Sequence, residues 1–430
     1  MNVLHKTVGG HMDMSVLETD RFKRNILMMT YMLPISSETT AMDILLPGVL
    51  LRGSVNYPTN AEIAKRCEHL FGTSLGYYYS YVGDNLMINF YVDFLSDSVV
   101  GTDGEILRGA AELLSQIWLH PVTDSAGFLR ANELDKVKRS LCDSIRADDN
   151  DTAAYASKKC REIMCEEEPC GYSISVDDIT CVTPKMISER YFELTKSSNL
   201  SFFYVGANSA ENVANALDLY FGDAVEEDRP VHSLNFYCAK QHPIVRKERT
   251  MQVTQGKLSI GIYAGGTIMS DSDDYYATLV AVEIFGGSPI SKLFMNVRER
   301  LGLCYYCGAT YNKQKGIIYV SAGIDSKERE NTEREINTQL DQMRKGNISE
   351  DELQAAKLSM INVVRQISDR PYSMWSFCHI RTTMGLSTSI DRHIERILKV
   401  SVQDVVRVAS TWTVGGVFFV NAENGGLYED

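Results

Sequence analysis

The sequence has 430 residues, 44% of them hydrophobic and 23% charged, so it is long enough for two or more domains and too ordinary in composition for general disorder. A formal net charge of −13 argues against a nucleic-acid or anionic-membrane partner, because both favour basic surfaces. The N-terminus shows no apolar signal core, and the nearest candidate for a membrane span, Asn25–Pro34, is shorter than the roughly 20 residues required, so we expect a cytoplasmic protein.

The first half of the chain predicts a sheet with several helices, from its apolar runs and helical periodicity. Strands are expected near Arg24–Pro34, Ser74–Val82 and Leu86–Phe94. Helices are expected near Thr39–Leu51, Asn60–Phe71, Gly104–Leu119, Phe128–Ala147 and Ala153–Met164. The half closes with a short amphipathic helix within 182–192, capped by a threonine, and an apolar strand at 200–206.

The second half repeats this plan after a charged, proline-punctuated linker. Strands are expected at Met251–Val253, Leu258–Tyr263, Cys307–Tyr311 and Ile317–Ile324. Helices are expected at Tyr275–Phe285, Ser291–Arg300, Lys327–Arg344 and Ser349–Arg365. The half ends with a serine-capped helix at 400–406 and a strand at 416–420. We therefore predict a duplicated domain of about 200 residues, with domains 1–225 and 246–430 joined by a linker at 226–245, and an α+β sandwich class.

The segment Ile44–Gly48, followed by Leu51–Gly53, is the most informative part of the chain. It resembles the zinc-binding helix of the pitrilysin/insulinase (M16) metallopeptidases, in which an HxxEH motif precedes a hydrophobic–basic–glycine ending. The resemblance puts Ile44 and Gly48 at the two histidine positions and Pro47 at the catalytic glutamate. None of the three can bind zinc or move a proton, and the Pro–Gly pair disfavours an unbroken helix there.

The third zinc ligand of these peptidases, a glutamate on a later helix, is also missing. The matching stretch is 136–146, where Asp143 or Ser144 falls nearest the ligand position and no glutamate occurs. A zinc-activated water needs both the ion and a nearby proton acceptor. The resemblance therefore implies no metal, no cofactor and no autonomous peptidase activity.

No other group of residues predicts a metal or redox site. The histidines form no HxxxH pair, and Glu68-His69 has Lys65 where a second histidine would be required, so His69 reads as a surface or boundary residue. Cysteines at 160, 165, 170 and 181 match no zinc spacing, and the pair at 304 and 307 lacks a thioredoxin-like context. We expect all ten cysteines to be reduced and structural, and the acidic runs 148–151 and 166–168 to be solvated loops.

The second half keeps more of the family pattern. Phe285–Phe294, with Gly286 and Gly287, resembles the family's glycine-rich turn before a helix, and 298–305 resembles its RE-x-x-GL-x-Y signature. In active relatives the residues corresponding to Arg298 and Tyr305 reach the substrate backbone, where they can donate hydrogen bonds to a carbonyl oxygen that gains charge. The alternative is that Arg298 caps or pairs within its own helix while Tyr305 fills a core.

The tyrosine-rich segment Ser74–Tyr81 stands where these peptidases present an edge strand to the substrate. Its candidate contact residues are Gly76, Tyr77, Tyr78 and Tyr79. Main-chain pairing with such a strand gives sequence-tolerant peptide binding, and tyrosines supply amphipathic contact surface. The alternative is an ordinary strand with tyrosines packed between layers.

The resemblance extends from Arg24 to Phe419 and is nearest to the zinc-less YmfF (or YfmF) subfamily, insulinase-like proteins associated with modification of translation elongation factor P. It implies two homologous α/β-sandwich domains of the LuxS/MPP-like type, forming half of a clamshell that closes around a peptide chamber. It also implies a heterodimer with a zinc-bearing M16 homologue, or a self-dimer, that binds an extended peptide or protein client. Two alternatives remain: a non-enzymatic scaffold that recruits a client, and an enzyme that holds another metal through Asp and Cys ligands.

Overall fold

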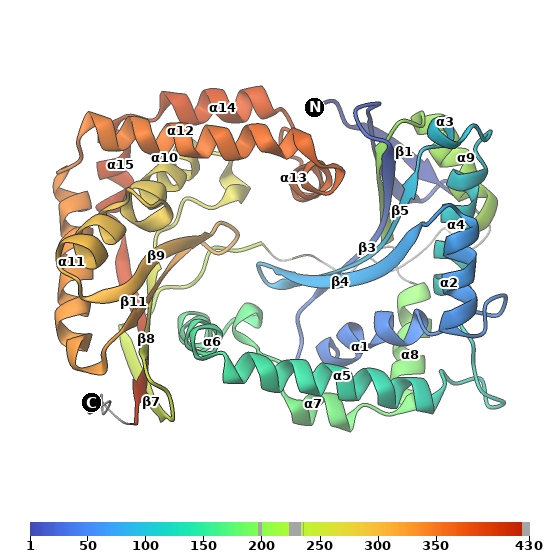
Figure 1. Cartoon of the computed structure of the whole chain (residues 1–430), viewed down its shortest axis with the longest axis horizontal. Coiled ribbons are helices and arrows are strands. Elements are labelled where there is room, and N and C mark those ends of the chain that lie inside the picture. The colour runs from blue at the N-terminus through green and yellow to red at the C-terminus, as the bar shows by residue number, and fades with distance from the viewer. Residues whose placement is uncertain (197–199, 223–233, 235, 424–430) are drawn as a thin grey trace, which may run out of the picture. The chain divides into compact units, whose positions relative to one another are not determined.

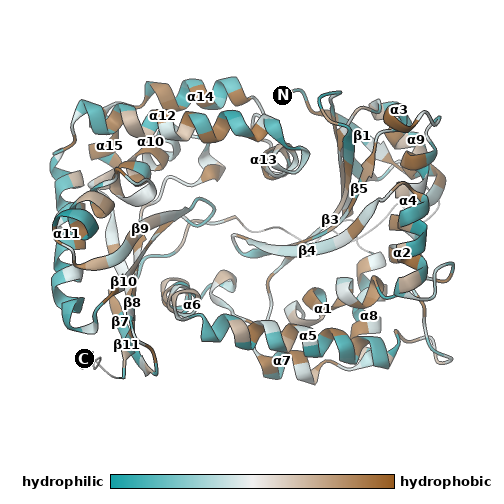
Figure 2. Ribbon diagram, viewed as in Figure 1, coloured by the Kyte–Doolittle hydropathy of each residue, from teal (hydrophilic) through white to brown (hydrophobic). Residues whose placement is uncertain are grey.

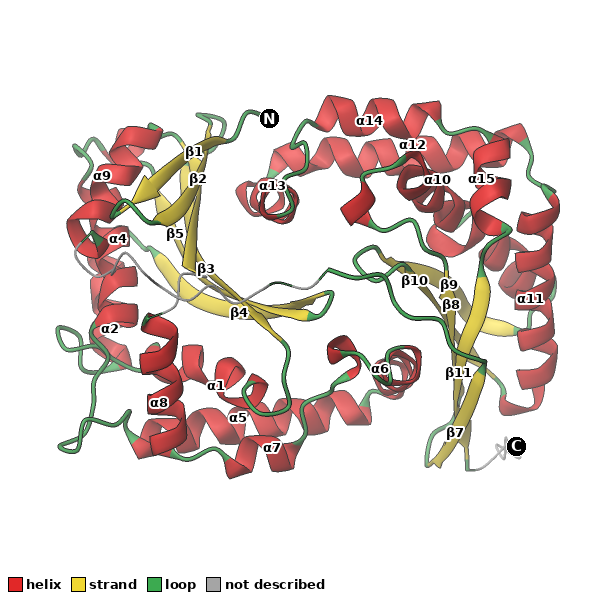
Figure 3. Ribbon diagram, turned by 180° about the vertical axis from the view of Figure 1, so that it is seen from behind, coloured by secondary structure: helices red, strands yellow, loops and turns green. Residues whose placement is uncertain are grey.

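The computed structural model describes residues 1–196, 200–222, 234 and 236–423, which form two compact units (Figure 1). Unit 1 comprises residues 1–145, 174–235 and 366–389, and unit 2 comprises 146–173, 236–365 and 390–430. Each unit has one sheet with helices packed on it (Figure 3), so the α+β class is confirmed. The predicted linker at 226–245 lies partly outside the described residues. Among the described residues, no helix is both long and apolar enough to span a bilayer.

Unit 1 contains a six-stranded sheet in the order β1-β2-β6-β3-β5-β4. The strands are β1 Leu4–Val8, β2 Met12–Glu18, β3 Arg24–Pro34, β4 Ser74–Val82, β5 Asn85–Leu95 and β6 Leu200–Gly206. Among the described strands of this sheet, β2 and β6 pair in parallel and the other neighbours are antiparallel. A two-residue turn joins β4 to β5, and Gly83 supplies its positive φ of 61°. The hairpin leaves β4 at the edge of the sheet.

Helices cover both faces of this sheet. The helices of unit 1 are α1 Thr40–Leu50, α2 Asn60–His69, α3 Asp97–Val100, α4 Glu105–Leu119, α5 Ala131–Asn150, α7 Val176–Cys181, α8 Pro184–Thr195, α9 Ala210–Phe221 and α13 Pro371–Thr383. On one face, Trp118 of α4 packs against Tyr31 and Phe90, with ring centroids 4.6 and 5.8 Å away. On the other face, α13 packs against β6 and β3. The core of unit 1 thus lies on both sides of β3.

Unit 2 contains a five-stranded sheet in the order β7-β11-β8-β10-β9; in its described part, β7 and β11 are parallel and the other neighbours are antiparallel. The strands are β7 Val245–Met251, β8 Gly256–Tyr263, β9 Cys304–Asn312, β10 Ile317–Ile324 and β11 Thr413–Ala422. The longer helices are α6 Thr152–Met164, α10 Asp273–Val282, α11 Arg329–Lys345, α12 Glu350–Gln366, α14 Ile390–Lys399 and α15 Val402–Ala409. Two π-helical segments, η3 Glu283–Gly287 and η4 Leu293–Arg300, pack against β9.

Surface helices of unit 2 follow the amphipathic rule. The buried residues of α11 include Thr332, Ile336, Leu340 and Met343, which recur every three or four positions, and the rest of the helix is hydrophilic (Figure 2). By contrast, α6 lies directly on the sheet, where Tyr155 and Met164 join a core with Tyr263 and Phe418. A Cβ at Gly261 would lie 2.3 Å from Met164 Cγ, so glycine is what allows this close approach.

Two helices pack in the unit opposite to the one that the predicted domain limits suggest. Residues 146–173, which include α6, belong to unit 2, and residues 366–389, which include α13, belong to unit 1. Neither assignment leaves a local mark in the sequence, because an amphipathic helix indicates that it is covered but not by which sheet.

The predicted strand at Met251–Val253 is wrong in position. Strand β7 ends at Met251, and the Val253 N–H bonds back to the Met251 carbonyl at 2.9 Å in a turn. The five residues between Val245 and Met251 are exposed, and most are charged, so the strand has no apolar alternation to detect. An edge strand tolerates this composition because charged side chains protect it from further pairing.

Candidate functional site

Helix α1, which contains the positions that the resemblance assigns to zinc ligands, runs unbroken through Pro47. The prediction of a break there is wrong. Proline removes only the N–H that would bond to the Asp43 carbonyl, and the Leu51 N–H still bonds to the Pro47 carbonyl at 3.1 Å. Ten of the eleven residues of α1 are buried, so tertiary packing outweighs the low helix propensity of Pro47 and Gly48.

A buried ion pair fixes α1 against α8. Asp43 accepts hydrogen bonds from Arg190 Nε at 2.7 Å and from Arg190 Nη2 at 3.1 Å. The side chains are 0% and 5% exposed, and Arg190 also pairs with Glu193 at 2.9 Å. A bidentate pair of this kind fixes both distance and orientation. It therefore sets the rotation of α1 that directs Ile44 and Gly48 toward the cavity described next.

A cavity of about 510 Å³ in unit 1 brings together positions that the sequence placed on three separate elements. Its lining includes Ile44 and Gly48 of α1, Tyr77 and Tyr79 of β4, and Ser144 of α5. Gly76 of β4 also lines it. Pro47, Tyr78 and Asp143 are not part of the lining, and Asp143 is exposed. Of the two candidates for the third ligand position, Ser144 is thus the one that faces the cavity.

The residues present do not fit a zinc ion. A Cβ at Gly48 would lie 2.8 Å from the Tyr77 hydroxyl and 2.8 Å from Val137 Cγ1, so a histidine at this position would require these side chains to move. Within the described residues, the cavity lining contains no histidine, cysteine, aspartate or glutamate. Protein zinc sites are built from these side chains. The lining therefore offers no zinc ligand among the described residues, and Tyr77 and Val137 crowd one of the two positions that the resemblance assigns to histidine.

The four candidate residues of β4 divide between the two faces of the sheet, because side chains alternate along a strand. Tyr77 and Tyr79 line the cavity, where burial raises the pKa of Tyr77 and the charge of Arg52 partly offsets that rise. Tyr78 points to the other face, with its ring centroid 5.9 Å from Trp375 and 5.8 Å from Tyr372 of α13. The alternative of tyrosines packed between layers thus describes Tyr78, while β4 itself is an edge strand.

In unit 2, Tyr305 lies on β9, the edge strand of the second sheet. Its neighbours Cys304 and Tyr306 pair with Ile324 and Gly323 of β10, and Tyr305 has no partner in this ladder, so it is the extra residue of a β-bulge. Bulges re-aim side chains and are frequent at sheet edges beside active sites. Tyr305 is 64% exposed and fills no core.

Arg298 is on η4, next to the start of β9. Its Nε lies 3.4 Å from Glu299 Oε1, and its guanidinium carbon lies 4.6 Å from the centre of the Phe294 ring. These contacts are within its own helix, as the alternative reading expected, but the side chain remains 39% exposed. A hydrogen bond from Cys307 and the charge of Arg298 lower the pKa of Cys304, which places the guanidinium near β9. Segments of π-helix are rare and are frequent at functional sites.

Gly286 and Gly287 end the π-helix η3, and the turn follows at 288–290. A Cβ at Gly286 would lie 2.6 Å from Ala309 Cβ, so this glycine lets η3 approach β9. Gly286 therefore supports the strand that presents Tyr305.

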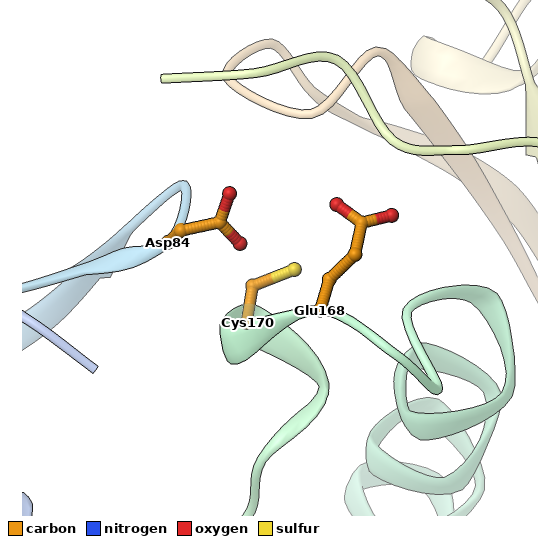
Figure 4. A group of neighbouring side chains, drawn as sticks. All are labelled: Asp84, Glu168 and Cys170. Carbon is orange, nitrogen blue, oxygen red and sulfur yellow. The ribbon is translucent and has the colours of Figure 1, made fainter. Parts of the chain in front are cut away.

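Two of the acidic runs are more ordered than predicted. Residues 148–150 end α5, and Asp151 caps α6 by accepting from the N–H groups of Ala153 and Ala154 at 3.0 and 3.1 Å. Glu168, drawn with Cys170 in Figure 4, pairs with the fully buried Lys315 and accepts from the Lys240 N–H at 2.8 Å. The prediction of a solvated loop is wrong for Glu168, since a buried lysine requires a carboxylate partner.

The cysteines are mostly buried in the protein interior, whereas His69 lies on the surface. All ten cysteines are free thiols, and eight of them are buried. His69 is exposed at the end of α2.

Comparison with known proteins finds similarity to M16 peptidases in sequence and in fold. Residues 182–360 match the family model described as "Peptidase M16 inactive domain". The chain is 26% identical over 426 residues to "Probable inactive metalloprotease YmfF" of Bacillus subtilis (strain 168), with 98% of each chain covered. A conserved protein from Enterococcus faecalis V583 has the same fold, with a TM-score of 0.89, 23% identity and coverage of 98% and 99%. A peptidase M16 inactive domain from Pseudomonas fluorescens gives a TM-score of 0.81 at 14% identity, with 99% of both chains covered.

Proposed function

We propose that this chain is an inactive homologue of the M16 metallopeptidases and serves as a non-catalytic subunit that pairs with a zinc-bearing M16 homologue. In this proposal the chain binds extended peptide or protein clients, and it completes the partner's peptidase site through Arg298 and Tyr305. The proposal includes a cytoplasmic location and a link to the modification of translation elongation factor P.

The contrast between the two edge strands supports this proposal most strongly. In unit 1, the ligand positions beside β4 hold Ile44, Gly48 and Ser144, none of which is a usual zinc ligand, so this chain needs another source of zinc for any cleavage. In unit 2, a bulge on β9 holds Tyr305 in solvent, although a large aromatic side chain loses apolar burial there. A phenol and a nearby guanidinium that remain accessible are suited to donate to a substrate carbonyl.

The edge position of β4 supports peptide binding. One side of β4 pairs with β5, and the sheet order leaves its other side without a neighbouring strand among the described residues. An extended peptide can add there through main-chain hydrogen bonds, with side-chain pockets on alternate residues. The cavity lined by Tyr77 and Tyr79 is such a pocket.

The test is to mix the purified chain with the zinc-bearing M16 homologue of the same source organism and to assay a quenched fluorescent peptide. We expect cleavage that a zinc chelator abolishes and that neither chain shows alone. Arg298→Ala and Tyr305→Phe should each lower kcat of the mixture by roughly 10²-fold, which is typical of losing one preorganised donor. Arg300→Ala, an exposed position on the same helix, is the matched control and should leave kcat unchanged.

Unchanged kcat in Arg298→Ala and Tyr305→Phe would contradict the role across subunits. Affinity purification from the source cell, followed by mass spectrometry, tests the remaining parts of the proposal. Recovery of elongation factor P and the zinc-bearing homologue supports it. Recovery of clients without any such homologue, together with an inactive mixture, indicates the scaffold instead.

A further inference from the structure

Among the residues that the structure describes, the cavity beside β4 contains one charged side chain, that of Arg52. All other lining residues are neutral within the described part of the chain, and they include the hydroxyl-bearing Tyr77 and Ser144 and the amide of Asn60. Each of these groups can donate a hydrogen bond. The electrostatic character of the cavity is therefore positive, in a chain whose net charge is −13.

Arg52 is half-buried and is not engaged by the protein's own carboxylates. Among the described residues, its guanidinium has no ion-pair or side-chain hydrogen-bond partner, although arginines elsewhere in unit 1, such as Arg190, Arg66 and Arg24, are paired with acids. Its charge acts on Tyr77, which lines the same cavity. A planar guanidinium favours bidentate contact with a carboxylate.

The position of the cavity relative to β4 indicates the kind of molecule that would bring this carboxylate. Leu75, Tyr77 and Tyr79 are alternate residues of the edge strand, and all three line the cavity. A peptide added along β4 would present alternate side chains to the same face. Hydrophobic walls formed by Ile44, Ile63 and Leu141 would cover the methylene groups of an acidic side chain.

We propose that the cavity at the former zinc position is a carboxylate-binding pocket for an extended peptide on β4, with Arg52 as the residue that pairs with the carboxylate. The carboxylate is either an Asp or Glu side chain or the C-terminal group of the peptide. This inference rests on the peptide-binding part of the proposed function and adds the preferred chemistry of the client. It involves neither zinc nor the partner subunit.

The experiment measures binding to the isolated full-length chain by fluorescence anisotropy. The probes are three labelled ten-residue peptides of alternating valine and threonine: one with a central Glu and an amidated C-terminus, its Gln twin, and the Gln peptide with a free C-terminal carboxylate. For wild type we expect at least one carboxylate peptide to bind about tenfold more tightly than the Gln amide, as for one charge-assisted pair. The peptide that gains affinity identifies the source of the carboxylate.

Variants of Arg52 then test whether this side chain causes the preference for a carboxylate. Arg52→Gln should remove the preference while leaving the affinity for the Gln amide peptide within about twofold, and Arg52→Lys should restore part of it. Arg139→Gln, an exposed position on α5 outside the cavity, changes the net charge equally and should keep the preference. Because Arg52 makes no internal pair among the described residues, the thermal unfolding midpoint of Arg52→Gln should match that of wild type.

Equal binding of all three peptides to wild type, or a preference that survives Arg52→Gln, overturns the pocket and leaves the proposed pairing with a zinc-bearing homologue untouched. A lack of binding by any peptide overturns both the pocket and the peptide-binding part of the proposed function. An intact carboxylate preference in a chain that fails to form an active mixture overturns only the pairing.

Discussion

The substitution Gly48→Ala tests whether the lost zinc site has been repacked or merely emptied. In an open helix interior, Gly→Ala gains about 1 kcal/mol of stability. Here the new Cβ would lie 2.8 Å from both the Tyr77 hydroxyl and Val137 Cγ1, well inside ordinary van der Waals contact. Overpacking of a core costs about 1–3 kcal/mol, so we expect Gly48→Ala to lower the free energy of unfolding by about 1 kcal/mol.

A double-mutant cycle separates the steric cost from the propensity gain. Val137→Ala removes the two methyl groups nearest to the new Cβ and should cost about 2 kcal/mol by itself, since Val137 is 6% exposed. In that background only the Tyr77 hydroxyl still crowds the new Cβ, and it is the end of a flexible side chain that can move, so Gly48→Ala should become neutral or stabilising as its methyl group partly fills the vacated space. The interaction between the two changes should then be at least about 1 kcal/mol, within the range found for residues in contact.

Urea unfolding followed by tryptophan fluorescence is the appropriate assay. Two of the three tryptophans, Trp118 and Trp375, are in unit 1, so the signal reports mainly on the unit that contains the site. A Gly48→Ala protein that is more stable than wild type would refute the repacking argument. So would an effect of equal size and sign in the Val137→Ala background.

Three further predictions follow from the same unit. Asp43→Ala should lower the free energy of unfolding in urea by about 3–5 kcal/mol, because it leaves Arg190 buried without its partner. The double variant Asp43→Ala/Arg190→Met should recover much of this stability. Equal losses of stability in the two variants would contradict the pairing argument. A fourfold variant that restores the ligands should still bind no stoichiometric zinc by elemental analysis, unless Tyr77 and Val137 are also made smaller; its substitutions are Ile44→His, Pro47→Glu, Gly48→His and Ser144→Glu. Tight zinc binding by the fourfold variant would show that the space for the ion is available. Burial lowers the pKa of His379 to about 4, whereas this side chain is protonated near pH 6.5 in the unfolded chain. Between these two pH values His379 is therefore protonated in the unfolded state and neutral in the folded state. The stability that depends on neutral His379 is complete above pH 6.5 and is lost as the pH falls toward 4. The loss amounts to about 3 kcal/mol, and His379→Leu should flatten the pH dependence of the urea midpoint between pH 7 and 4; an unchanged slope would exclude His379 as its source.

Local signals in the sequence predicted much of the fold because their physical causes are local. The helix caps at the end of each half are an example: Thr183 Oγ1 accepts from the Met186 N–H at 3.2 Å, and Ser401 forms a capping box with Asp404. The long apolar strand β3 and the helix α4 were found for the same reason, since their burial depends on their own composition.

Features set by distant residues were missed or misplaced. The strand β7 is defined by parallel pairing with β11, about 170 residues further along the chain, and its charged sequence shows nothing of this. The placement of α6 on the second sheet depends on the absence of a side chain at Gly261, a residue that reads only as a weak strand position. The bulge at Tyr305 likewise depends on the register between β9 and β10.

The candidate site also combines features that the local sequence predicts with features that depend on distant residues. The missing ligands at Ile44 and Gly48 could be read from a motif, because ligand chemistry belongs to single residues. The side chains that surround these positions could not be predicted from the sequence, because they depend on which residues of β4 face α1. That choice follows from the register of the β4–β5 hairpin, in which a shift of one residue would bring Tyr78 into the cavity and place Tyr77 against α13.

The repacked site also determines how readily this chain could regain a metal. Ligand loss alone would leave a space that a few substitutions could refill. Here the glycine at position 48 and the side chains of Tyr77 and Val137 are mutually dependent, since each occupies volume that the others leave free. Restoring a histidine would therefore require simultaneous changes on α1, β4 and α5, and every intermediate would suffer either a clash or a cavity. Among the described residues, the cavity lining has neutral side chains at the ligand positions and a single charged one, that of Arg52, so it suits an anion better than a cation.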